Sequence, residues 1–286
     1  MAITEHALQA FVPGLGFGEA PRWRSGSLWL SDIARRAVLR IDALSGAVER
    51  VFSTPGEPSG LGWLPDGSML VVQMEEHEVL RWDGSALKLY ARTGAFSRAR
   101  LNDMVVASDG RAWLSNMGFD YESEAVRATT LVGLDPQGVA HAAARDLWCP
   151  NGMAIAPSGK HLIVGQSASR EVLAFDIAPP GSLDGRRVFG TLPEGACSDG
   201  LCVDVAGAVW IASPTTREFL RMEPGGTITD RVPTPERYAI ACVLGGQDRR
   251  TLFCLTAATL SLHAARGTSE GRVERVRVTV PGAGTP

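Results

Sequence analysis

The feature that most constrains this chain is a pattern that recurs six times along it. Each copy contains a short polar or small pair, an apolar stretch, a turn with Gly or Asp, and a β-rich run. The copies begin at Glu19, Ser59, Asn102, Asn151, Asp199 and Ile240, at intervals of 40, 43, 49, 48 and 41 residues. A four-stranded propeller blade repeats at this period. The sequence therefore predicts an all-β fold, a six-bladed β-propeller with four-stranded blades around a central channel.

The remaining strands of each blade can also be located in the sequence. A third strand-like segment follows the hairpin in five copies, at 37–42, 78–83, 131–135, 171–176 and 218–223. The segment 7–13 precedes the first copy, and we expect it to pair with strands of the last blade and close the ring. Closure removes the exposed sheet edges that an open array would carry. On this interpretation residues 1–286 form a single β-propeller domain.

Composition excludes several classes of function. The formal net charge of the 286 residues is −3, and no block of Lys or Arg stands out, so a nucleic-acid partner is not expected. No apolar run approaches the roughly 18–20 residues that span a bilayer. The N-terminal segment has no secretory features, which predicts a cytoplasmic protein acting on a small molecule. The five cysteines form no C-x-x-C motif and are expected to be buried, reduced thiols. The oligomeric state stays open.

The first residues of the copies differ in a way that packing does not explain. In a propeller, equivalent positions of the blades lie on a ring around the axis. Four of these residues, Glu19, Asn102, Asn151 and Asp199, would therefore bring two carboxylates and two amide carbonyls to one mouth of the channel. Such oxygen ligands suit a hard divalent cation such as Ca²⁺, Mg²⁺ or Mn²⁺. The alternative is that Asn-Asp, Asn-Gly and Asp-Gly are turn dipeptides.

The sequence resembles a known family over about residues 15–260. The resemblance rests on GEAPRW at 18–23, RLND at 100–103, PNGMA at 150–154 and SDGL at 198–201, in this order and spacing. These motifs are similar to those of the regucalcin (senescence marker protein)/gluconolactonase family of six-bladed propellers.

The resemblance implies a set of site residues. One divalent metal would be bound by Glu19, Asn151 and Asp199, with Asn102 reaching the metal or the substrate. Ca²⁺ is the first candidate, and Mg²⁺, Mn²⁺, Zn²⁺ and Fe²⁺ are others. Arg100 corresponds to an arginine that contacts the substrate.

Two departures from the family pattern concern the substrate pocket. The family's acidic substrate contact corresponds most nearly to Asp120, in a loop, 117–127, that also contains Phe119. The sixth copy begins Ile240-Ala241-Cys242, which makes that side of the channel apolar. Both features argue against a polyhydroxylated aldonolactone and leave a lactone open. Trp148 is a further candidate for the pocket wall.

The family's typical activity is the hydrolysis of sugar lactones, and related propellers hydrolyse phosphotriesters. We therefore expect a divalent-metal-dependent hydrolase that opens a lactone, or a related cyclic or aryl ester, with a metal-activated water and Asp199 as general base. A phosphotriesterase-like hydrolase and a non-catalytic calcium-binding propeller are the alternatives.

One hydrolase motif is rejected on its context. Residues 267–271 match G-x-S-x-G, the motif that carries the nucleophile of serine hydrolases. That serine needs a strand before it and a helix after it. Ser269 is instead expected in a polar loop, without a catalytic role.

Overall fold

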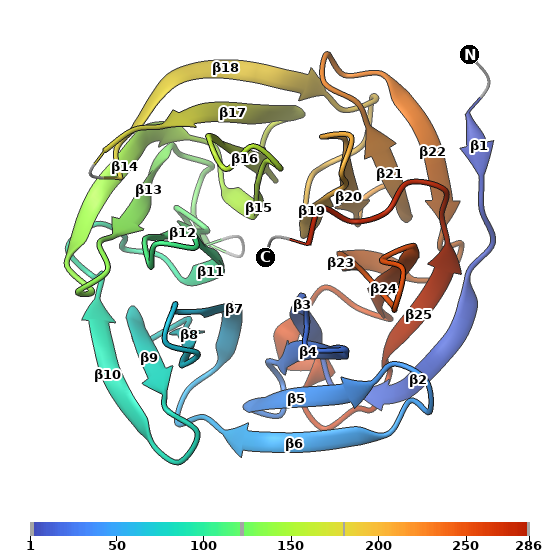
Figure 1. Ribbon diagram of the computed structural model, residues 1–286, viewed down its shortest axis with the longest axis horizontal. Helices are drawn as coiled ribbons and strands as arrows, with labels where there is room; N and C mark the ends of the chain where they lie inside the picture. The colour runs from blue at the N-terminus through green and yellow to red at the C-terminus, as the bar shows by residue number, and fades with distance from the viewer. Residues whose placement is uncertain (1–2, 121–122, 180, 285–286) are drawn as a thin grey trace.

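Six antiparallel β-sheets surround a central axis in the computed structural model (Figure 1). The structure describes residues 3–120, 123–179 and 181–284. Each sheet contains four strands that form one blade, and one of the six sheets has a fifth strand. The predicted six-bladed β-propeller is thereby confirmed.

The first three blades follow one another directly along the chain. Blade 1 consists of β3 (Gly18–Arg24), β4 (Ser27–Asp32), β5 (Ala37–Asp42) and β6 (Val48–Ser53). Blade 2 consists of β7 (Pro58–Trp63), β8 (Met69–Gln73), β9 (Glu78–Trp82) and β10 (Leu87–Arg92). Blade 3 consists of β11 (Leu101–Val106), β12 (Ala112–Asn116), β13 (Thr129–Leu134) and β14 (Ala140–Leu147).

The last three blades complete the ring. Blade 4 consists of β15 (Pro150–Ile155), β16 (His161–Gln166), β17 (Glu171–Ile177) and β18 (Leu183–Thr191). Blade 5 consists of β19 (Leu201–Val203), β20 (Val209–Ser213), β21 (Glu218–Met222) and β22 (Ile228–Pro233), and β1 (Thr4–Glu5) is added parallel to β22. Blade 6 consists of β23 (Tyr238–Gly245), β24 (Thr251–Ala257), β25 (Gly271–Arg277) and β2 (Gln9–Leu15).

The ring closes through the N-terminal segment, because β2 pairs antiparallel with β25. The apolar core lies between neighbouring blades rather than within one of them. Trp113 of β12, for example, packs in a cluster with Met153 and Val164 of blade 4. Burial of such side chains stabilises the contact between consecutive sheets.

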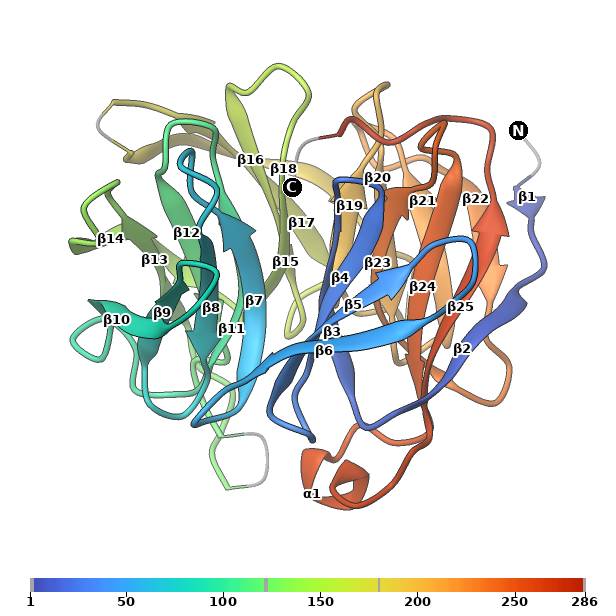
Figure 2. The same cartoon turned by 60° about the horizontal axis from the view of Figure 1, so that its bottom comes forward.

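One face of the ring carries the longer connections. The loop between β12 and β13 and the short helix α1 (Leu262–Ala265) both project from this face (Figure 2). In the described part of the chain, α1 has four residues and no helix reaches the length needed to cross a membrane.

Candidate active site at the channel mouth

The inner strands are irregular where the repeats begin. The pairing of the inner strand with its neighbour shifts register between Glu19 and Arg22, Pro58 and Leu61, Leu101 and Met104, and Pro150 and Met153. Such bulges turn side chains away from the regular alternation of a strand. Asn102 and Asn151 lie inside β11 and β15, so the turn-dipeptide alternative is wrong for these two residues.

Neighbouring inner strands approach one another closely at this level. A Cβ atom on Gly152 would lie 2.5 Å from the carbonyl oxygen of Asp199 and 2.5 Å from the nitrogen of Leu201. Only a residue without a side chain fits there. The glycine after Asn151 therefore allows blade 4 to lie directly against the segment that contains Asp199.

The polar side chains at the mouth are held by short contacts. Glu19 is 7% exposed, and its Oε2 accepts a hydrogen bond of 2.9 Å from the backbone N–H of Ala20. Asn151 is 6% exposed and donates through Nδ2 to Ser167 Oγ at 3.0 Å. Asp199 precedes β19 and keeps some solvent exposure. Its backbone N–H donates to the carbonyl of Ala212 at 2.9 Å.

A chain of hydroxyl groups supports Asn102. Ser59 Oγ donates to Asn102 Oδ1 at 3.3 Å, and Ser31 Oγ donates to the carbonyl of Ser59 at 2.6 Å. All three residues are buried. These contacts connect the inner strands of blades 2 and 3 with β4 of blade 1.

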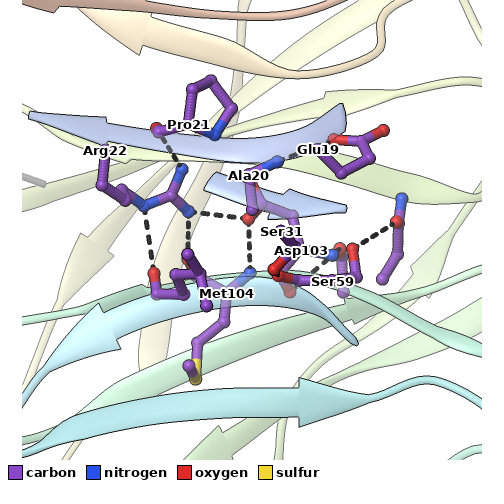
Figure 3. A network of polar contacts seen from close by, with 11 residues as sticks. Glu19, Ala20, Pro21, Arg22, Ser31, Ser59, Asp103 and Met104 are labelled. Carbon is purple, nitrogen blue, oxygen red and sulfur yellow. Dashed lines mark hydrogen bonds and ion pairs between the residues drawn. The ribbon is translucent and has the colours of Figure 1, made fainter. Parts of the chain in front are cut away.

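A buried ion pair lies beside the mouth residues (Figure 3). Arg22 Nη2 donates to Asp103 Oδ1 at 2.6 Å and to the Met104 carbonyl at 2.5 Å. Its Nε donates to the carbonyl of Leu61 at 3.0 Å, and its Nη1 to that of Pro21 at 2.9 Å. The guanidinium thus joins blades 1, 2 and 3 while it neutralises Asp103.

Burial makes ionisation of the two mouth carboxyls costly. It raises the pKa of Glu19 well above the usual range, and the negative charge of Asp199 raises it further. Burial also raises the pKa of Asp199 to about 7, while a hydrogen bond from the Asn151 side chain lowers it and the charge of Asp103 raises it. A bound cation would reverse this preference for the neutral acids.

The donor set fits a hard divalent cation in its chemistry. Within the described residues, no three His, Cys, Asp or Glu side chains are grouped to hold a metal ion. Glu19 and Asp199 offer carboxylate oxygens here, and Asn102 and Asn151 offer amide oxygens, so these side chains could hold a cation. Such mixed oxygen ligands are typical of Ca²⁺ and Mg²⁺.

The remaining candidate residues lie toward the rim. Arg100, which precedes β11, has a side chain that is 42% exposed and forms an ion pair with Glu75 of blade 2. Asp120 is exposed, and its Oδ2 accepts a hydrogen bond of 2.6 Å from Ser123 Oγ in its own loop. Trp148 is 42% exposed. None of these three is buried with the mouth residues described above.

Two other expectations concern the apolar residue Ile240 and the serine of the rejected hydrolase motif, Ser269. Ile240, at the position equivalent to Glu19 in blade 6, is 1% exposed and packs in an apolar cluster. Ser269 lies in an irregular segment, where its Oγ accepts a hydrogen bond of 2.7 Å from Arg35. No helix follows it, since β25 begins at Gly271.

The sequence analysis missed Arg22 and Asp103, although a signal was present. Asp103 comes one residue after the start of its copy, where the other copies have Ala20, Gly60, Gly152, Gly200 and Ala241. Arg22 comes three residues after the start, where the others have Gly62, Val105, Ala154, Cys202 and Val243. One acid and one base among small and apolar residues predict a buried pair, because the repeat places both on inner strands.

Fold and site together define the class of protein: a six-bladed propeller with a buried polar site where its inner strands begin. The model of the SMP-30/Gluconolactonase/LRE-like region matches residues 17–258, and the chain belongs to this family.

Relatives and solved structures agree with this assignment. The chain is 26% identical over 278 residues to a 6-deoxy-6-sulfogluconolactonase of Pseudomonas putida, a match that covers 94% of each chain. It resembles the structure of a calcium-binding protein, regucalcin, from Agrobacterium tumefaciens with a TM-score of 0.84 and 20% identity, covering 100% of this chain and 99% of the other. A gluconolactonase from Xanthomonas campestris has a TM-score of 0.76 and 25% identity, covering 96% of this chain and 89% of the other.

Proposed function

We propose that this protein is a divalent-cation-dependent lactonase, with a lactone or a related cyclic or aryl ester as its substrate. The charge at the channel mouth carries the proposal. Because Arg22 neutralises Asp103, the carboxylates of Glu19 and Asp199, once ionised, leave two negative charges that one divalent cation would balance. The lactonases among the relatives support the class of reaction.

Three residues would bind the cation in this proposal, and a fourth could join them. Glu19, Asn151 and Asp199 are the ligands, and Asn102 reaches either the cation or the substrate. Ca²⁺ is the first candidate, since one structural relative is a calcium-binding protein. When bound, the cation would polarise the substrate carbonyl and stabilise the negative charge that develops on its oxygen.

The protein's own groups would perform the proton transfer. Asp199 suits the role of general base because it keeps solvent exposure, whereas Glu19 is buried. Asp199 would take a proton from the attacking water and return it to the ring oxygen that leaves. Arg100 would exchange its ion pair with Glu75 for the substrate carbonyl or the product carboxylate.

The test is reconstitution of protein that has been stripped with a chelator. Ca²⁺, Mg²⁺, Mn²⁺, Zn²⁺ and Fe²⁺ are returned one at a time, and ring opening of a lactone panel is followed by acid release. We expect one or more cations to restore lactone hydrolysis. Full activity in the chelator would refute the cation requirement.

The same experiment separates the alternatives. Aryl esters and phosphotriesters are assayed beside the lactones. Turnover of phosphotriesters alone would identify a phosphotriesterase-like hydrolase. Tight Ca²⁺ binding without turnover of any substrate would identify a non-catalytic calcium-binding propeller.

A further inference from the structure

Two cysteines from different blades lie close together in an apolar cluster between blades 5 and 6. Cys202 lies in β19 and Cys242 in β23, and their Sγ atoms are 3.9 Å apart. The two residues are 40 positions apart, about one repeat, so the propeller brings together thiols that no local motif would pair.

The backbones that carry these thiols are already in contact. The N–H of Gly200 donates to the carbonyl of Ile240 at 2.9 Å. A Cβ atom on Gly200 would lie 2.4 Å from that of Ala241, so a glycine is needed for this approach. Cys202 and Cys242 each lie two residues beyond this hydrogen bond. A disulfide requires closely spaced Cα atoms, and the contact between these strands holds the two cysteines near one another.

One thiol of the pair, that of Cys202, borders a small cavity between the inner strands. The cavity has a volume of about 20 Å³ and is lined by Cys202 with Arg22, Met153 and Val243, among others. It holds a molecule of the size of water. Cys202 is partly exposed, whereas Cys242 is 2% exposed. We therefore expect a small oxidant to reach Cys202 more readily than a bulky one.

We propose that Cys202 and Cys242 form an oxidisable dithiol, which hydrogen peroxide converts into a disulfide that joins blade 5 to blade 6. Sulfur of Cys202 attacks the peroxide, an S–O bond forms as the O–O bond breaks, and one water leaves. Sulfur of Cys242 then attacks Cys202, the S–S bond forms as the S–O bond breaks, and a second water leaves. The two thiols supply both electrons and both protons.

A third thiol provides an internal comparison. Cys254 lies opposite Cys242 in the pairing of β24 with β23 and is fully buried. Its Sγ points to the carbonyl of Leu252 at 3.9 Å. Cys254 does not line the cavity, so the oxidant is expected to reach Cys202 before it reaches Cys254.

The test is mild treatment of the folded protein with hydrogen peroxide, followed by alkylation in denaturant and a non-reducing peptide map. We expect loss of two thiols and one linked peptide pair containing Cys202 and Cys242, reversed by dithiothreitol. The cross-link should raise the melting temperature by roughly 5–10 °C, because it constrains the unfolded chain. Oxidised glutathione, which is too large for the cavity, should produce no cross-link.

Variants complete the test. Cys202→Ser and Cys242→Ser should each abolish the linked peptides, whereas the matched controls Cys197→Ser and Cys254→Ser should retain them. The wild-type map needs no variant, so it decides the question even where a substitution prevents folding. A Cys242–Cys254 bridge, a sulfinic acid at Cys202, or intact thiols at peroxide levels that oxidise Cys197 would overturn the proposal.

Discussion

The inner strands of blades 1 and 6 are neighbours, and they carry residues of opposite character at the same repeat position. Glu19 and Ile240 both begin their copies and are both buried, at 7% and 1% exposure. Ile240 packs against apolar side chains, which stabilises the fold, whereas a buried carboxylate costs free energy until a partner balances it. The repeat determines where a side chain lies. The residue type determines whether packing or a ligand must satisfy it.

The largest expected effect comes from removing the charge of Asp199, which begins the fifth copy where the sixth begins with Ile240. Asp199→Asn retains the size of the side chain but loses the proton acceptor. Turnover of a lactone at saturating cation should fall by about 10³-fold, the range for a general base. Steady-state kinetics measure the loss, with Ser269→Ala as the control that keeps full activity. Normal turnover in the Asp199 variant would remove it as the base.

A second change concerns the position three residues after the start of each copy, where blade 1 has Arg22 and blade 6 has Val243. Arg22→Met leaves the carboxylate of Asp103 buried without its partner. The free energy of unfolding should decrease by about 3 kcal/mol, as measured by urea denaturation. Asp103→Asn in the same chain should recover part of this loss. If Arg22→Met alone leaves the free energy of unfolding unchanged, the ion pair does not stabilise the inner strands at the mouth.

The third prediction concerns the titration of Glu19 and Asp199. Ile240, at the equivalent position of blade 6, has no ionisable group. The pKa values of Glu19 and Asp199 are raised in the folded protein without cation, to about 7 for Asp199. The folded state then binds more protons than the unfolded chain, so their contribution to stability is present at low pH and is lost as pH rises toward 7. The melting temperature of chelated wild-type protein should decrease between about pH 5 and pH 8 relative to that of Glu19→Gln/Asp199→Asn. Saturating cation should abolish this difference in pH dependence, and equal slopes without cation would contradict the expected pKa values.

The smallest effect is expected at the rim, two residues before the ring, where blade 3 has Arg100 and blade 6 has Tyr238. Arg100→Ala should raise KM about tenfold and leave cation affinity unchanged, because this side chain is proposed to contact only substrate. Arg98→Ala is the matched control, an exposed arginine two residues away. Weaker cation binding in the Arg100 variant would assign the residue to the metal site instead.

The propeller could be predicted from the sequence because the same strand pattern recurs six times along the chain. A chance resemblance seldom recurs so often at a regular interval. The positions of Glu19, Asn102 and Asn151 on inner strands, and of Asp199 just before one, followed from the same repeat. The Arg22–Asp103 pair was missed although both residues stand out at their repeat positions. The two lie 81 residues apart, and their contact depends on how closely blades 1 and 3 approach. The ion pair of Arg100 with Glu75 was missed for a similar reason, because the repeat pattern does not indicate which exposed side chains contact one another.

The way the ring closes determines when the mouth can form. β2 pairs with β25, and β1 adds to β22, so one short N-terminal segment holds two of the last blades to the first. A ribosome makes this segment first, and it must wait for nearly the whole chain before its partners exist. Until then blade 1 has no neighbour on its open side, so we expect Glu19 and Asp199 to stay hydrated and apart. If the proposed cation binds at the mouth, the closed ring is the first state in which it can contact both carboxylates.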